Sequence, residues 1–213
     1  MAAVGLLYVG AVLVVNGAML LGHVDPRGAA PLNLFVGAPQ VVTPTYLIIV
    51  AAGDPGRIAL AAGLYFFGFT YLWVGINGIT GWPNEGLGWF SLVVALAAVA
   101  FAVHSVLEVG DRTFGVIWSL WAVLWFAFFL LMALHRDHLA PAIGVLAAGE
   151  GLLTAAVPAF LIIVGWWSDS TTTVLVVAVL GLLLLAASVP VSRSLSAGAP
   201  RSTIRPGAAP GVQ

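Results

Sequence analysis

The feature that most constrains this chain is a series of seven apolar stretches, each long enough to cross a lipid bilayer. A membrane-spanning helix needs about 20 apolar residues to cross about 30 Å of hydrocarbon. Short connections separate the stretches and hold nearly all of the charged residues. The pattern predicts an all-α integral membrane protein whose spans are 3–22, 31–52, 57–80, 87–107, 113–134, 139–167 and 171–191.

Composition supports a membrane protein and excludes several other classes. The chain has seven basic and eight acidic residues among 213, and 62% of its residues are hydrophobic. An ordinary soluble domain carries about 25% charged residues, so a soluble enzyme is excluded. Cysteine and lysine do not occur, which removes thiolate metal sites, cysteine nucleophiles and Schiff-base chemistry. The net charge of −1 argues against nucleic acid as a partner, and no cofactor or metal is predicted.

The distribution of arginine predicts how the chain lies in the membrane. Cytoplasmic connections are enriched in basic residues. The odd-numbered connections and the C-terminal tail hold five arginines, whereas the even-numbered connections hold two. We therefore expect the N-terminus outside and the C-terminus in the cytoplasm. The predicted organisation is a six-span domain at 1–168, an additional transmembrane helix at 169–191 and a disordered cytoplasmic tail at 192–213, rich in Ser, Pro, Ala and Gly.

Polar residues inside the spans are few and therefore informative. Glu150 lies in the middle of the sixth span, where a charge is costly unless it is satisfied. A functional role and a packing role stay equally open for it. Asn16 and Asn77 could hold a neutral polar solute or tie two helices together, and a tie is slightly favoured for Asn77. No paired acids, Ser/His dyad or clustered metal ligands lie at one depth, so an enzyme is not expected.

Three of the spans carry a stripe of residues along one helix face. The members of each stripe share +3/+4 spacing: Leu6, Val9, Leu13 and Asn16 in the first span; Phe67, Thr70, Val74 and Asn77, with Tyr71 beside them, in the third; and Trp118, Trp121 and Trp125, with Leu124 beside them, in the fifth. Three indoles on one face suit a narrow slot lined by flat rings. Such a slot would admit a small, planar, uncharged solute, whereas no ring of charges or carbonyls is evident for an ion.

Short segments along residues 4–167 resemble, in order, the UreI/AmiS family of bacterial urea and short-chain amide channels. The matching segments are LLYVG at 6–10 with Asn16-Gly17, VDP at 24–26, NLFVG at 33–37, FGFTYL at 67–72, the three-indole helix with VLW at 123–125, and EG at 150–151 with LTA at 153–155. Six segments in sequential order over residues 4–167 are a far more specific signal than one short motif.

The resemblance implies a fold, an assembly and a set of pore residues. Family members are twisted six-helix bundles that form hexamers, with lipid in the centre of the ring and a separate pore in each protomer. The solute crosses passively, and a cytoplasmic urease or amidase consumes it. Carried over position by position, with Asn77 added from the stripe in the third span, the implied pore-lining residues are Leu6, Val9, Leu13, Asn16, Phe67, Thr70, Tyr71, Asn77, Trp118, Trp121, Leu124, Trp125 and Glu150.

Two departures from the family pattern qualify this prediction. Acid-gated members have a long, His-rich loop between the second and third spans, whereas this chain has only Gly53-Asp54-Pro55-Gly56 there, so gating by that loop is not expected. The second departure is the seventh span, because six-helix members end near Trp167. The extra helix could alter the oligomer.

Together these observations predict a passive channel for urea or short-chain aliphatic amides in a bacterial plasma membrane. The preference between urea and amides stays open. One alternative is a proton-coupled transporter that carries H⁺ on Glu150. Another is a membrane protein with a structural or sensory role and no transport.

Overall fold

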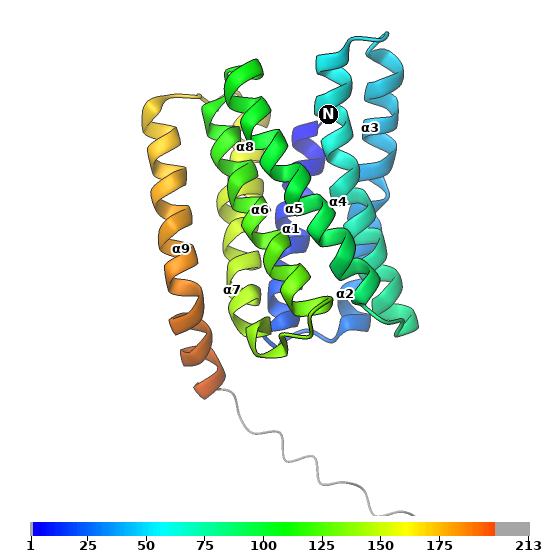
Figure 1. The fold of residues 1–213 in the computed structure, drawn as a ribbon, viewed down its shortest axis with the longest axis vertical. Coiled ribbons are helices and arrows are strands. Elements are labelled where there is room, and N and C mark those ends of the chain that lie inside the picture. Colours follow the sequence, from blue (N-terminus) through cyan, green and yellow to red (C-terminus); the bar gives the residue numbers. More distant parts are fainter. Residues whose placement is uncertain (1, 199–213) are drawn as a thin grey trace, which may run out of the picture.

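All seven predicted spans are present as helices long and apolar enough to cross a membrane. The computed structural model describes residues 2–198, and every element in that range is helical. Successive spans run in opposite directions and form an upright bundle (Figure 1). The helices are α1 (Ala2–Leu20), α2 (Pro26–Gly37), α3 (Pro39–Val50), α4 (Pro55–Thr80), α5 (Glu85–His104), α6 (Arg112–Met132), α7 (Ala140–Glu150), α8 (Val157–Ile163) and α9 (Thr171–Gly198).

Local chemistry explains where the observed spans differ from the predicted ones. The second span begins at Pro26 rather than at residue 31, because the Asp25 side chain accepts a hydrogen bond from the backbone N–H of Arg27 at 2.8 Å. An acidic N-cap followed by proline is a strong helix start. The sixth span ends at Ile163 rather than at residue 167, because Gly165 takes the left-handed conformation, with φ of 76°.

Two of the spans are interrupted near prolines. The second span consists of α2 and α3, which meet at Ala38, directly before Pro39. In the sixth span a π-helical segment, Gly151–Ala156, joins α7 to α8 just before Pro158. Proline has no amide hydrogen to donate and its ring crowds the preceding turn, so the helix must adjust locally. A second π-helical turn, Ser105–Val109, extends α5, and a 3₁₀ turn, Asp137–Leu139, precedes α7.

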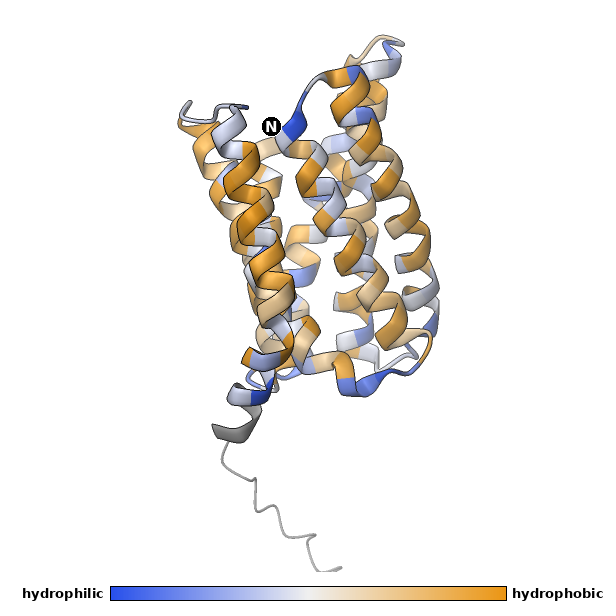
Figure 2. Ribbon diagram, turned by 60° about the vertical axis from the view of Figure 1, so that its left-hand side comes forward, coloured by the Kyte–Doolittle hydropathy of each residue, from blue (hydrophilic) through white to orange (hydrophobic). Residues whose placement is uncertain are grey.

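The outside of the bundle is apolar and its two ends are hydrophilic (Figure 2). This is the distribution that a lipid-embedded protein requires. Inside, α1 packs tightly on the sixth span through two glycines. A β-carbon at Gly10 would lie 2.6 Å from the carbonyl oxygen of Gly151, and one at Gly17 would lie 2.5 Å from that of Gly144. Any side chain at either position would push the helices apart.

The seventh span, α9, lies against α6 and α7 (Figure 1). It continues to Gly198, so residues 192–198, predicted as the start of a disordered tail, are helical. The Ser192 hydroxyl donates back to the carbonyl of Val189 at 2.8 Å, as a helical serine can, so its polarity does not end the helix. The rest of the predicted tail, 199–213, lies outside the described residues. The division into a six-span domain and an added helix stays a prediction.

Candidate functional site

A cavity of about 600 Å³ opens at one end of the bundle and reaches its centre. Its mouth lies among Asn84, Glu85, His135 and Asp137, in the connections that follow α4 and α6. The arginine distribution predicts that this end faces the cytoplasm. Nine of the thirteen predicted pore residues line the cavity: Leu13, Asn16, Phe67, Thr70, Tyr71, Asn77, Trp121, Leu124 and Trp125.

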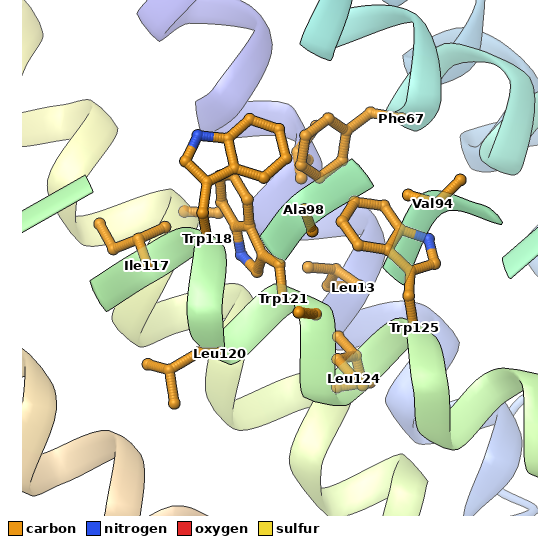
Figure 3. Close-up of a cluster of buried hydrophobic side chains, with 14 of the residues drawn as sticks. Leu13, Phe67, Val94, Ala98, Ile117, Trp118, Leu120, Trp121, Leu124 and Trp125 are labelled. Atoms are coloured by element: carbon orange, nitrogen blue, oxygen red, sulfur yellow. The ribbon is translucent and has the colours of Figure 1, made fainter. Parts of the chain in front are cut away.

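Aromatic rings close the inner end of the cavity (Figure 3). The aromatic slot, defined here as Phe67, Trp121 and Trp125, joins α4 to α6. The Phe67 ring centroid lies 4.9 Å from each of the two indoles, and the indoles are nearly perpendicular to each other at 6.4 Å. Leu13 of α1 approaches the slot from a third helix. The slot therefore presents ring edges and faces, with no charged side chain among them.

Contacts on both sides of α1 turn Leu13 towards the cavity. Gly10 and Gly17 face the sixth span, while Asn16 faces α2, where its amide pairs with that of Asn33. The angle between these two packed faces contains Leu13. The same logic orients α4, whose Gly68 packs on the backbone of α3 and leaves the adjacent face to the cavity.

Two of the predicted polar residues, Asn16 and Thr70, already donate their hydrogen bonds to other groups of the protein. The Asn16 amide donates to the Asn33 carbonyl oxygen at 2.9 Å and accepts from the Asn33 amide at 2.7 Å. Asn16 is therefore a tie between α1 and α2, although it also borders the cavity. The Thr70 hydroxyl donates to the carbonyl of Phe66 at 2.6 Å and can offer a solute only its acceptor lone pairs.

The two indoles of the aromatic slot differ in whether their N–H group already has a hydrogen-bond partner. The Trp121 N–H donates to the Thr154 hydroxyl at 2.8 Å, and that hydroxyl donates to the backbone carbonyl of Glu150 at 2.6 Å. Thr154 belongs to the π-helical segment of the sixth span and is fully buried. By contrast, the Trp125 N–H has no partner among residues 2–198. Only Trp125 keeps its donor free.

Tyr71 offers the second free polar group of the cavity. Its ring stacks near Phe67, with centroids 6.4 Å apart, and its hydroxyl bonds to no other described side chain or carbonyl. Asn77, nearer the mouth, uses its amide nitrogen on the Asn84 side chain at 2.8 Å and on the Pro83 carbonyl at 3.3 Å. The Asn77 carbonyl oxygen is buried without a partner in the described range.

Four predicted pore residues lie outside the cavity lining: Leu6, Val9, Trp118 and Glu150. Leu6, Val9 and Trp118 are buried, and Trp118 packs 4.8 Å from Trp121 on the far side of the slot. Glu150 is fully buried, and neither of its carboxyl oxygens has a hydrogen-bond partner within the described chain. The assignment of these four residues to a pore stays a prediction.

Sequence reasoning missed several lining residues, although the stripes already held a signal for some of them. Phe128 and Met132 line the cavity and continue the +3/+4 spacing of the indole stripe beyond Trp125. Leu20 likewise continues the stripe of the first span, four residues after Asn16. The other missed residues include Met19, Leu87, Ser91 and Leu131.

Formal charge in the cavity is confined to its mouth. The lining residues that can carry charge near neutral pH are Glu85, His135 and Asp137. The His135 Nε2 and a Glu85 carboxyl oxygen lie 3.7 Å apart, but the side chains are 66% and 47% exposed. Water screens such a pair, so it adds little stability. Beyond the mouth, a solute meets aliphatic and aromatic surface with a few neutral polar groups.

A bundle of membrane-spanning helices around a cavity that is uncharged beyond its mouth and ends in aromatic rings defines a membrane transport protein for small uncharged solutes. Comparison with known proteins agrees with this class. The chain belongs to the AmiS/UreI family of transporters, whose model matches residues 1–166. This match confirms the family that the sequence segments predicted. The members of this family are transporters or channels and not enzymes, as the sequence also predicted.

Curated relatives and solved structures share most of the chain. A protein of Mycolicibacterium smegmatis named as an amidate substrates transporter is 54% identical over 197 residues, 92% of each chain. The acid-activated urea channel of Helicobacter pylori strain J99 is 32% identical over 75% of this chain and 95% of its own. The cryo-EM structure of the Helicobacter pylori urea channel in a closed state matches with TM-score 0.72 and 34% identity, covering 79% of this chain and all of that one. A crystal structure of that channel gives 0.69 and 32%, with the same coverage.

Proposed function

We propose that this protein is a passive channel for urea or short-chain aliphatic amides, with one pore in each protomer. The observation that carries the proposal is the aromatic slot at the end of a cavity that is uncharged beyond its mouth, where the Trp125 N–H and the Tyr71 hydroxyl are free. Relatives named for amidate substrates and for urea support this choice of solute.

The free groups match the chemistry of an amide. The carbonyl oxygen of urea or acetamide can accept from the Trp125 N–H, and its NH₂ group can donate to the Tyr71 hydroxyl. Planar solutes can lie against the rings of Phe67 and Trp121 while they shed water. An ion would lose its hydration in the same place with no charge to replace it, which is costly.

We propose that acid does not gate this channel through an outer loop. The connection between α3 and α4 is a tight turn at residues 51–54, with Ala52 and Gly53 at positive φ and no histidine. The relative from Helicobacter pylori is named as acid-activated. A turn that is this short and carries only Asp54 offers no basic group to titrate between pH 5 and 7.

The rival mechanism, proton-coupled transport on Glu150, has one observation in its favour. A fully buried carboxyl group whose oxygens both lack partners among the described residues is a candidate proton carrier. However, Glu150 is not part of the cavity lining, so a solute in the cavity would not contact it. Passive transport needs no such group.

Stopped-flow light scattering on proteoliposomes tests the two mechanisms. Inward gradients of urea and of acetamide should give rapid flux that rises linearly with concentration, at similar rates at pH 5 and pH 7, with or without an uncoupler. Uphill uptake that collapses with the uncoupler would support the Glu150 carrier instead. Flux no faster than in empty liposomes for either solute would sink the proposed function.

Assembly and location follow from the family resemblance and are proposals as well. We propose a homo-hexamer in the bacterial inner membrane with lipid in the centre of the ring, the N-terminus outside, and a cytoplasmic urease or amidase consuming the solute. Mass measurement of the detergent-solubilised protein tests the hexamer. Because the chain has no cysteine, single cysteines in the connections test the orientation by their reaction with an impermeant thiol reagent.

A further inference from the structure

The connection between α8 and α9 is bound to the first turn of α6. Asp169 accepts hydrogen bonds from the backbone N–H groups of Arg112, at 3.2 Å, and of Thr113, at 3.0 Å. It also accepts from the Thr113 hydroxyl, and Thr113 is fully buried. In the same region the rings of Phe114 and Trp167 meet edge to face at 5.9 Å.

These hydrogen bonds provide acceptors for backbone N–H groups in the first turn of α6. The first four N–H groups of a helix have no partner within it. Asp111, the N-cap residue of α6, accepts from the Phe114 N–H at 2.8 Å. Asp169, 56 residues from Thr113 along the chain, supplies acceptors for two more. The beginning of α6 is therefore capped by a segment that leads directly into α9.

A second contact joins α9 to α6, on the face of α6 that points away from the aromatic slot. A β-carbon at Gly181 of α9 would lie 2.6 Å from the Leu120 side chain, so α9 meets α6 at close range there. Leu120 points away from the slot (Figure 3). Gly149 of α7 is packed equally closely by Leu184 of α9. Both Asp169 and α9 lie beyond residues 1–166, which the family model matches.

We propose that Asp169 is a positioning residue through which the seventh helix holds α6, and with it the aromatic slot, in place. An α-helix advances about 1.5 Å per residue, so Trp121 lies about 12 Å and Trp125 about 18 Å along the axis from Thr113. A stiff helix transmits a shift of its first turn to both indoles. The effect on solute selection rests on the proposed channel function, whereas the effect on slot geometry does not.

Two variants test the contact and a third serves as control. Asp169→Ala removes the whole cap, and Thr113→Val removes only the hydroxyl in case the first variant fails to fold. Asp25→Ala removes a cap of one backbone hydrogen bond from α2, a helix that carries no member of the aromatic slot. Gel filtration of each variant in detergent reports whether it folds.

The first measurement does not need transport. In a Leu124→Cys background, whose thiol would be the only one in the chain, we measure the rate of reaction with a small thiol reagent. Leu124 lines the cavity next to the slot. We expect Asp169→Ala to change this rate about fivefold, as loss of a helix cap changes the populations of capped and freed states, and Asp25→Ala to leave it unchanged.

The second measurement is the ratio of acetamide to urea permeability in proteoliposomes. We expect Asp169→Ala to shift this ratio by a similar factor, with a smaller shift in Thr113→Val and none in Asp25→Ala. An unchanged thiol rate in Asp169→Ala overturns the inference whatever the flux. A changed thiol rate with an unchanged ratio in a conducting protein supports the positioning role and overturns its effect on solute selection. If the unmodified protein carries neither solute, the proposed function fails and the thiol rate alone decides the inference.

Discussion

The two halves of the bundle, on either side of the aromatic slot, are built differently from the same helices. In the half that ends at Asn84 and His135, a cavity of about 600 Å³ separates α1, α4 and α6. In the other half α1 and α6 hold predicted pore residues that are packed: Leu6 and Trp118 are 7% and 8% exposed, and Val9 is fully buried. The slot is therefore a boundary, and we infer that the barrier to a solute lies at the slot and in the packed half.

The largest effect is expected from Trp125→Ala, which would remove one wall of that boundary. The widened slot should raise the permeability of butyramide relative to urea about tenfold, because shape selection in such a pocket is worth that much. Stopped-flow flux measures the ratio. Trp89→Ala is the matched control, because Trp89 is 56% exposed and does not line the cavity. Equal ratios in the two variants would remove Trp125 from the path.

Tyr71→Phe should reduce urea flux about fivefold, the effect of losing one hydrogen bond to a desolvated solute. The change removes a single oxygen and leaves the ring stacked near Phe67. Tyr65→Phe is the control, because the Tyr65 hydroxyl bonds to Thr45 at 2.7 Å and is not in the cavity. If both variants conduct equally, the Tyr71 hydroxyl does not contact the solute.

Leu6→Ala tests whether the packed half of the bundle limits the passage of the solute. If the packed half limits passage, truncating a buried leucine there should raise urea flux about threefold, the result of a cavity that partly relaxes. Leu131→Ala makes the same change in the half that is already open and should have no effect on flux. A larger rise for Leu131→Ala would place the barrier at the mouth instead.

The smallest effect concerns the two acids that bond to the first turn of α6, Asp111 and Asp169. Burial raises the pKa of Asp111, and nearby Asp169 adds to the rise. The hydrogen bond from the Thr113 side chain leads the causes that lower the pKa of Asp169. An acid with a raised pKa destabilises the fold while ionised, and protonation removes that cost as the pH falls. An acid with a lowered pKa stabilises the fold above its ordinary pKa of 3.8 and loses this as the pH falls further.

Thermal unfolding in detergent measures these two contributions. Relative to Asp111→Asn, the unmodified protein should gain in Tm as the pH falls from 7 towards the ordinary pKa of 3.8. Relative to Asp169→Asn, it should lose a similar amount below about pH 3.8. Parallel curves for all three proteins would mean that neither acid is perturbed by the contact.

Periodicity and length were sufficient to predict the spans. The +3/+4 stripes also brought Leu13, Phe67 and Trp121 to the lining of one cavity, because helical geometry fixes which residues share a face. Sequence could not distinguish Trp121 from Trp125, since the difference depends on Thr154 in a distant π-helical turn. The hydrogen bonds between Asp169 and α6 could not be predicted from the sequence either, because no local pattern links residues 56 positions apart.

The reciprocal amide bonds between Asn16 and Asn33 bear on how the protein is made. The two residues are 17 positions apart, on consecutive helices, and both are buried. Each amide alone would enter hydrocarbon with unsatisfied donors and acceptors, which opposes insertion of either helix by itself. Paired, they cancel most of that cost. We therefore expect the first two spans to enter the membrane together as one helical hairpin. The Asn16–Asn33 pair would then fix their register before α6, which carries the indoles, is synthesised.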